Sequence, residues 1–282
     1  SLQIWHFEEA FVFHGDHERD LRMALGLVQR GEWPAVTPSI SPFPIQLGPL
    51  LYLILAPIVA VSADPFFIKN VFVLFTMLGC ALFFNTLRRC IRWEAALFCI
   101  GALVASVFTF EMSRQLWHSS LLPLPIAVFY GAAHRILHGH PHLRRNITVA
   151  GISVAIAVQL HAVGSIFGLL WLALLWIRRK DLKKKDVLVS ISAVVLTALP
   201  FLWTLIQTIQ VADAGPSDSM PSTWQPASLW TVAAFFLENI KPIWGDNVGP
   251  WMIWPWSLLL LWGAVSAVRK RNRFAIFLVA NV

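Results

Sequence analysis

The acidic segment at residues 13–20 reads Phe-His-Gly-Asp-His-Glu-Arg-Asp, so two histidines and four charged side chains stand close together. Asp16 is its best candidate for chemistry, because a carboxylate with a tuned pKa can take the proton from an attacking hydroxyl as a general base. On a helix that begins near Asp16, Arg19 and Asp20 follow one turn later, and the two aspartates share a face. The alternative is a solvated helix start in which Asp16 is only an N-cap.

Metal binding is a second chemistry that the acidic segment could support. Imidazole and carboxylate groups suit several divalent ions, and His14, Asp16, His17 and Glu18 could supply half of such a site. Their spacing is not diagnostic for any metal. The use of a divalent ion as cofactor therefore stays open at the level of sequence.

Two further positions could contact an anion. Arg114 and His118 are four residues apart, so one helical face could present both to a phosphate group. The alternative is an interfacial anchor in which Arg114 extends to the headgroups. His161 stands between two apolar runs, where an ionisable residue usually faces a cavity or a partner.

The composition indicates that a membrane protein positions these residues. Hydrophobic residues make up 57% of the chain and charged residues 13%, about half of the usual charged fraction of roughly 25%. A soluble core could not hide so much apolar surface. The three cysteines have no metal-ligand spacing and imply no disulfide framework.

Long apolar runs predict an all-α integral membrane protein, a polytopic helical bundle of about seven to eight transmembrane helices. A further run begins at residue 274. The runs lie at 66–87, 94–111, 119–137, 146–162, 163–178, 187–208 and 251–268.

Basic turns predict the orientation, because loops rich in Lys and Arg stay cytoplasmic. Sixteen of the 22 basic residues fall in four turns, at 88–93, 135–145, 178–186 and 269–273. The remaining turns are then outside, and they carry 12 of the 15 acidic residues. Lys69 and Arg114 are among the few cations on that side.

We expect a single transmembrane domain over 1–282, and expect it to be a fragment of a longer protein. Residues 1–65 form a first, periplasmic loop of short juxtamembrane helices, and residues 209–250 form a second outer loop. The apolar stretch 48–62 must begin and end on the outer face, and its internal proline and length disfavour a span. We interpret it as a non-spanning element that lines a cavity.

Several function classes lose their simplest support. The chain has no phosphate-binding glycine loop of the P-loop type, no G-x-G-x-x-G and no G-x-S-x-G elbow. The net charge of +7 follows from the cytoplasmic turns, so it does not indicate nucleic acid as a partner.

The order of the motifs resembles the polytopic GT-C glycosyltransferases, in particular the bacterial branch related to protein O-mannosyltransferases and aminoarabinose transferases. The resemblance covers residues 1 to 180, and beyond them only hydropathy supports it. It lies in the acidic segment, Gly-Glu-Trp-Pro at 31–34, Gly-Pro-Leu-Leu-Tyr at 48–52, Arg-Gln-Leu-Trp-His-Ser-Ser-Leu-Leu-Pro at 114–123 and Gln-Leu-His at 159–161.

The resemblance implies that an aspartate of the first outer loop acts as base while a sugar leaves a polyprenyl-phosphate carrier. Asp16 is the matching position. The residues that would position the loop or bind substrate and phosphate are Arg19, Asp20, Lys69, Arg114, His118 and His161.

One departure from the family pattern bears on the metal. Many relatives carry a second acidic residue where this chain reads Trp-His-Ser-Ser at 117–120. His118 or Glu111 would have to take its place, and the candidate metal ligands become Asp16, His17 and Glu111.

We therefore expect a multi-pass glycosyltransferase of a bacterial inner membrane, with its active site facing the periplasm. Its partners would be the polyprenyl-phosphate sugar donor, a lipid, glycan or protein acceptor, and membrane lipids. The main alternative is a transporter or lipid flippase in which Asp16, Arg114 and His161 line a passage. Transporters place ionisable residues near the middle of their helices, whereas the helix interiors here are nearly free of charge. A catalytically inactive scaffold of the same fold is a third option.

Overall fold

The computed structural model describes residues 15–33, 47–105, 118–161 and 164–213, including the side chains of 17–33, 47–104, 118–161, 164–204 and 206. Every regular element in these ranges is a helix, and no strand occurs in them. The contacts divide the chain into two compact units, 1–211 and 212–282, and the first unit holds the elements discussed here. The all-α class predicted from sequence is confirmed for the described chain.

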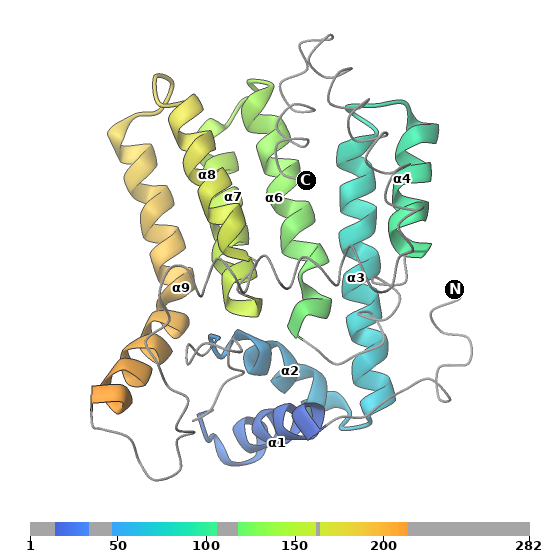
Figure 1. Cartoon of the computed structure of the whole chain (residues 1–282), viewed down its shortest axis with the longest axis vertical. Coiled ribbons are helices and arrows are strands. Elements are labelled where there is room, and N and C mark those ends of the chain that lie inside the picture. Colours follow the sequence, from blue (N-terminus) through green and yellow to red (C-terminus); the bar gives the residue numbers. More distant parts are fainter. Residues whose placement is uncertain (1–14, 34–46, 106–117, 162–163, 214–282) are drawn as a thin grey trace, which may run out of the picture. The chain divides into compact units, whose positions relative to one another are not determined.

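The helices follow one another with short connections wherever both neighbours are described (Figure 1). They are α1 (Gly15–Arg30), α2 (Leu50–Val61), α3 (Pro65–Leu87), α4 (Trp93–Ala105), the 3₁₀ helix η1 (His118–Leu121), α6 (Pro123–Leu137), α7 (Leu143–Leu160), α8 (Gly164–Ile177) and α9 (Lys184–Asp213).

Three described stretches are long and apolar enough to cross a membrane, namely Pro65–Leu87, His118–Leu137 and Lys184–Thr204. In the third, only 11% of the most apolar window is buried inside the protein, and Leu188 and Leu196 are each 65% exposed. Water would disfavour so much continuous apolar surface, whereas lipid tails would cover it. The structure therefore supports a membrane protein.

The expected number of about seven to eight spans is not confirmed. α8 has 14 residues and is about 21 Å long at 1.5 Å per residue, which is short of a hydrocarbon core of about 30 Å. α7 has 18 residues, but its first turn carries Arg144 and Arg145. The expected run at 251–268 lies outside the described residues, as does most of the second outer loop at 209–250.

One hydrophobic core cluster joins the α1–α2 pair to the ends of three other helices. Ile68 and Phe72 come from the first turns of α3, Leu121 from η1 and Leu160 from the last turn of α7. From α1 and α2 the cluster takes Leu21, Ala24, Leu51, Tyr52, Leu55 and Val59. The basic-turn pattern places these same three helix ends on one side of the membrane, so the packing and the charge pattern agree.

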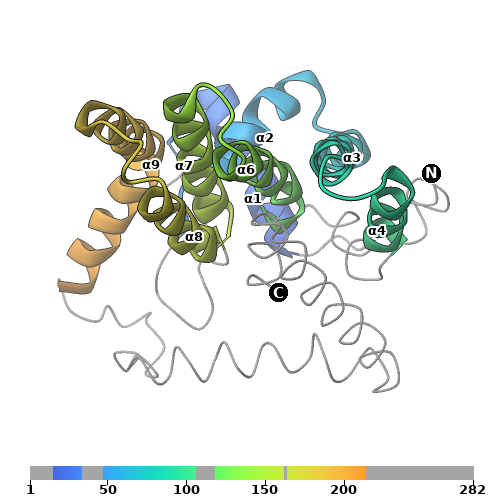
Figure 2. The same cartoon turned by 90° about the horizontal axis from the view of Figure 1, so that it is seen from above.

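The remaining bundle is centred on α6 and α7, and only some of its contacts join neighbours in sequence. α6 packs on α3 and on α7, and α7 packs on α8 (Figure 2). α3 and the start of α6 approach backbone to backbone, because a Cβ at Gly79 would lie 2.7 Å from the carbonyl carbon of Pro123. The Thr76 hydroxyl donates to the carbonyl of Ser120 at 3.1 Å and joins α3 to η1 beside this contact.

Candidate functional site

The acidic segment continues into α1, and one face of this helix is buried. The side chains of His17, Asp20, Leu21 and Ala24 are all buried, and their spacing of three and four residues puts them on a single stripe. α1 packs on α2. The helix predicted to begin near Asp16 is thus present, whereas the solvated alternative does not describe the face that carries Asp20. Asp16 lies one turn before Asp20 along the backbone, and its side chain is outside the described residues.

Asp20 ties α1 to α2 through a buried hydrogen bond. The Tyr52 hydroxyl donates to Oδ1 of Asp20 at 3.0 Å, and Nε and Nη2 of Arg19 donate to the same oxygen at 3.1 and 3.0 Å. Burial and then the negative charge of Asp20 raise the pKa of Tyr52, so the phenol stays a donor. A buried carboxylate with these partners fits the positioning role predicted for Asp20 better than phosphate binding, since two anions would repel each other.

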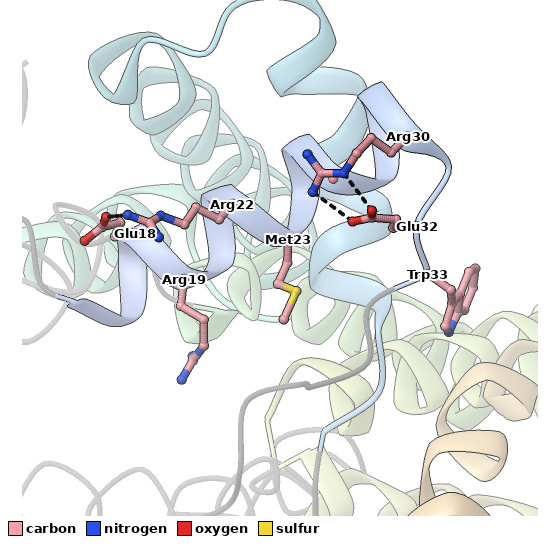
Figure 3. A pocket seen from close by; sticks show the side chains of 8 residues that line it. Glu18, Arg19, Arg22, Met23, Arg30, Glu32 and Trp33 are labelled. Carbon is pink, nitrogen blue, oxygen red and sulfur yellow. Dashed lines mark hydrogen bonds and ion pairs between the residues drawn. The ribbon is translucent and has the colours of Figure 1, made fainter.

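The other face of α1 forms a groove of about 570 Å³, called here the α1 groove (Figure 3). Its side chains come from positions about four residues apart, so they follow one edge of the helix and continue just past its end. The lining residues are Glu18, Arg19, Arg22, Met23, Gly26, Arg30, Glu32 and Trp33.

Ion pairs occupy both ends of the α1 groove (Figure 3). Arg22 pairs with Glu18 one turn earlier. Arg30 donates to both carboxylate oxygens of Glu32, from Nε at 2.7 Å and from Nη2 at 2.8 Å. The hydrogen bond from Arg30 lowers the pKa of Glu32. Because these groups are exposed, the pairs add little stability, and their importance lies in the donors and acceptors that they present.

A turn at Gly31 positions Glu32 and Trp33 at the far end of the groove. Gly31 has φ of +67°, its N–H donates to the Leu27 carbonyl at 3.2 Å, and the N–H of Glu32 donates to the Gly26 carbonyl at 3.3 Å. These two bonds form the C-terminal cap in which a left-handed residue, usually glycine, ends a helix. The turn brings Glu32 back beside Arg30 and leaves Trp33 half exposed.

The structure also brings together two of the predicted substrate-binding residues that are distant in sequence. The rings of His118, in η1, and His161, after α7, stack with centroids 5.4 Å apart. Lys69 in α3 is fully buried beside Ile68 of the core cluster. The elements that carry Asp20, Lys69, His118 and His161 therefore meet around one cluster. Arg114 lies outside the described residues.

Of the three metal ligands proposed from sequence, the structure describes the side chain of one. Among the described residues, no group of three His, Cys, Asp or Glu side chains could hold a metal ion. Of the three candidate ligands, His17 is buried on α1. Glu111 and the side chain of Asp16 lie outside the described part of the chain.

Sequence reasoning missed two features of this site. The first is the hydrogen bond of Tyr52, which the sequence analysis treated only as part of the apolar stretch 48–62. A single tyrosine in such a run indicates a buried hydroxyl with a hydrogen-bond partner. The groove residues Glu18, Arg22 and Arg30 were visible as charges, and their spacing of four and eight residues could have placed them on one helix face.

The resemblance to the GT-C glycosyltransferases thus rests on the motifs of the sequence. Independently of that resemblance, the structure shows the Asp20–Tyr52 bond, the paired histidines and the α1 groove. Comparison of the chain with protein-family models, with curated proteins and with solved structures found no match.

Proposed function

We propose that the chain is an integral membrane glycosyltransferase that moves a sugar from a polyprenyl-phosphate donor to an acceptor on the outer face of the membrane. One observation carries the proposal: the acidic segment leads into a helix that the buried Asp20–Tyr52 bond ties to the non-spanning α2. A single core cluster then joins both helices to the ends of α3, η1 and α7. A lipid-linked donor needs such a place, where its tail lies in the bilayer and its phosphosugar lies at the surface.

The proposed roles follow from the charges of the groups. Asp16 takes the proton of the acceptor hydroxyl as general base. The phosphate of the leaving carrier gains negative charge as the glycosidic bond breaks, and Lys69 and Arg114 would stabilise that charge. Arg19, which is paired with Asp20, would hold the acidic segment in position. His118 and His161 would complete the phosphate surroundings as neutral or protonated donors.

The same proposal includes the finer architecture expected from sequence. The chain would contribute about seven to eight spans to a protein of a bacterial inner membrane, with residues 1–65 and the active site on the periplasmic side. The agreement between the basic turns and the core cluster supports this orientation.

Asp16→Asn in the complete protein tests the proposal, because the amide keeps the shape of the side chain and cannot accept the proton. We expect transfer of radiolabelled sugar from polyprenyl-phosphate donors to fall by about 10²- to 10⁴-fold, the usual contribution of a general base, with membrane insertion and expression unchanged. Asp64→Asn is the matched control. Asp64 caps α3 by accepting from the Phe66 N–H at 3.0 Å, and asparagine caps equally well, so transfer should persist.

Full transfer by the Asp16→Asn protein would remove Asp16 from the catalytic role. The assay offers several donor sugars, each with and without a chelator, so the same experiment decides the dependence on a divalent ion. If the wild-type protein transfers no sugar but moves the donor across sealed vesicles, the flippase alternative replaces the enzyme.

A further inference from the structure

The α1 groove lies on the helix that carries Asp16, and none of its lining residues acts on the reacting groups in the transfer chemistry proposed above. Asp20 belongs to the buried face of α1, whereas the groove follows the exposed face. Arg19 connects the two, since its guanidinium contacts Asp20 and the residue is among those that line the groove. The volume of about 570 Å³ is in the range of small-molecule sites.

The charges of the groove argue against an anionic ligand. Each of its three arginines already holds a carboxylate: Arg19 holds Asp20, Arg22 holds Glu18 and Arg30 holds Glu32. The lining has three arginines and two glutamates, a net charge of +1, and Asp20 below Arg19 offsets that charge. A phosphate would have to displace a carboxylate or lie beside one, so it would gain little.

The same pairs suit a ligand that both donates and accepts hydrogen bonds. A guanidinium has five N–H donors, and Arg30 uses two of its nitrogens on Glu32, so donors remain. The paired carboxylates keep lone pairs that hydroxyl groups can use. Hydroxyl-rich ligands match this alternation of donor and acceptor along the helix, and the match requires no net charge.

An apolar surface completes the groove. Trp33 is 50% exposed at one end, and Met23 lines the middle (Figure 3). An exposed indole offers a large, rigid apolar face with a polar edge. The C–H face of a pyranose ring fits such a surface while its hydroxyls contact the ion pairs.

We propose that the α1 groove binds a neutral saccharide, and that this saccharide is part of the acceptor. The second half rests on the proposed function, whereas the first half stands without it. A sugar held along the groove passes Arg19 and Glu18, within one turn of Asp16 along the backbone. The groove therefore holds the acceptor next to the general base and selects an uncharged, hydroxyl-rich molecule.

The test measures binding directly, on the full chain in lipid nanodiscs, by saturation-transfer NMR. The probes are three neutral trisaccharides, maltotriose, mannotriose and tri-N-acetylchitotriose, and two anions, glucose 1-phosphate and inorganic phosphate. We expect at least one trisaccharide to bind more tightly than either anion. Its affinity should change less than about twofold between low and high salt, because screening acts on charged ligands.

Two groove variants and one control separate this groove from other surfaces. Trp33→Ala should weaken trisaccharide binding about tenfold, the effect of losing an aromatic contact worth about 1.4 kcal/mol. Trp93→Ala, at a tryptophan that is 60% exposed at the start of α4, should leave binding unchanged. Glu32→Gln removes an acceptor and raises the net charge of the lining, so it should weaken the trisaccharide and strengthen phosphate.

Three results would each overturn the inference: no trisaccharide binds, the two tryptophan variants behave alike, or phosphate binds the wild-type protein more tightly than any trisaccharide. Failure of the enzyme proposal looks different. A protein that binds trisaccharide through Trp33 but transfers no sugar retains the groove site and loses the acceptor role. If the wild-type protein binds no trisaccharide and the Trp33→Ala protein transfers sugar as well as the wild type, the enzyme proposal stands and the groove site is rejected.

Discussion

At the scale of single residues, Asp20 explains why the acidic segment has a fixed place. A buried carboxylate is costly unless charge and hydrogen bonds compensate it. Arg19 supplies the charge from a side chain that is 36% exposed, while Asp20 itself is almost fully covered. Tyr52 supplies a neutral donor from α2. This arrangement holds the first turns of α1 in one position, and Asp16 is in the first of them.

Removal of the Tyr52 hydroxyl should therefore loosen the α1–α2 contact. We expect Tyr52→Phe to lower the free energy of unfolding by about 1–3 kcal/mol, the cost of a lost hydrogen bond to a charged group. Thermal unfolding in one detergent measures the change. Tyr130→Phe is the control, because Tyr130 packs through its ring against Phe83 and Phe167, with centroids 5.5 and 5.9 Å apart. Equal losses in the two variants would exclude a special role for the Asp20 bond.

At the scale of elements, the close contact of α3 with the start of α6 positions the helices that carry Lys69 and His118. Gly79 lets the two backbones meet at Pro123, and Thr76 bonds to Ser120 next to it. η1, which carries His118, is thereby held against α3, the helix that carries Lys69. A small residue at a helix crossing is a common device for close approach in membranes.

Gly79→Ala tests this contact, because the new methyl group would overlap the backbone of α6. We expect the two helices to separate and the free energy of unfolding, measured by thermal unfolding in detergent, to fall by about 1–3 kcal/mol, as for other overpacked sites. Gly101→Ala in α4 is the matched control, since a Cβ there meets nothing within 4 Å. Alanine is the better helix former by up to about 1 kcal/mol, so the control should be neutral or stabilised. A Gly79→Ala protein as stable as the control would contradict the packing.

At the scale of the whole molecule, charge and packing separate two sets of helix ends. The core cluster gathers the start of α3, the end of α7 and η1 around α1 and α2. At the basic ends, Nη1 of Arg144 at the start of α7 lies 3.9 Å from Oδ1 of Asp186 at the start of α9. The apolar window of α9 is only 11% buried inside the protein, so it offers surface that lipid could cover. We therefore expect the membrane to lie across the helices, between the α1–α2 pair and the basic helix ends.

Cysteine labelling checks this placement. The variants have single cysteines at Val28 on α1 or at Lys184, the first residue of α9, in a protein without Cys80, Cys90 and Cys99. Both positions are exposed. An impermeant thiol reagent added outside intact cells should label position 28 at once and position 184 only after the membrane is opened. Labelling of both positions from the same side would overturn the topology and, with it, the outer active site.

The sequence by itself determined whatever depends on neighbouring residues. Hydropathy runs predicted the helices, basic turns predicted which ends lie together, and local caps fixed boundaries such as Asp64 with Pro65 before α3 and Gly31 after α1. These signals are short in range, so they can be seen without the fold. The run expected at 163–178 likewise became α8, Gly164–Ile177.

Only the tertiary structure decided what depends on distant partners. Asp20 and Tyr52 are 32 residues apart, and the two faces of α1 could be told apart only once α2 covered one of them. The His118–His161 stack likewise needs η1 against the end of α7. The physical reason is that helix periodicity groups residues into stripes but does not say which stripe is buried, since burial is a property of the packing between elements.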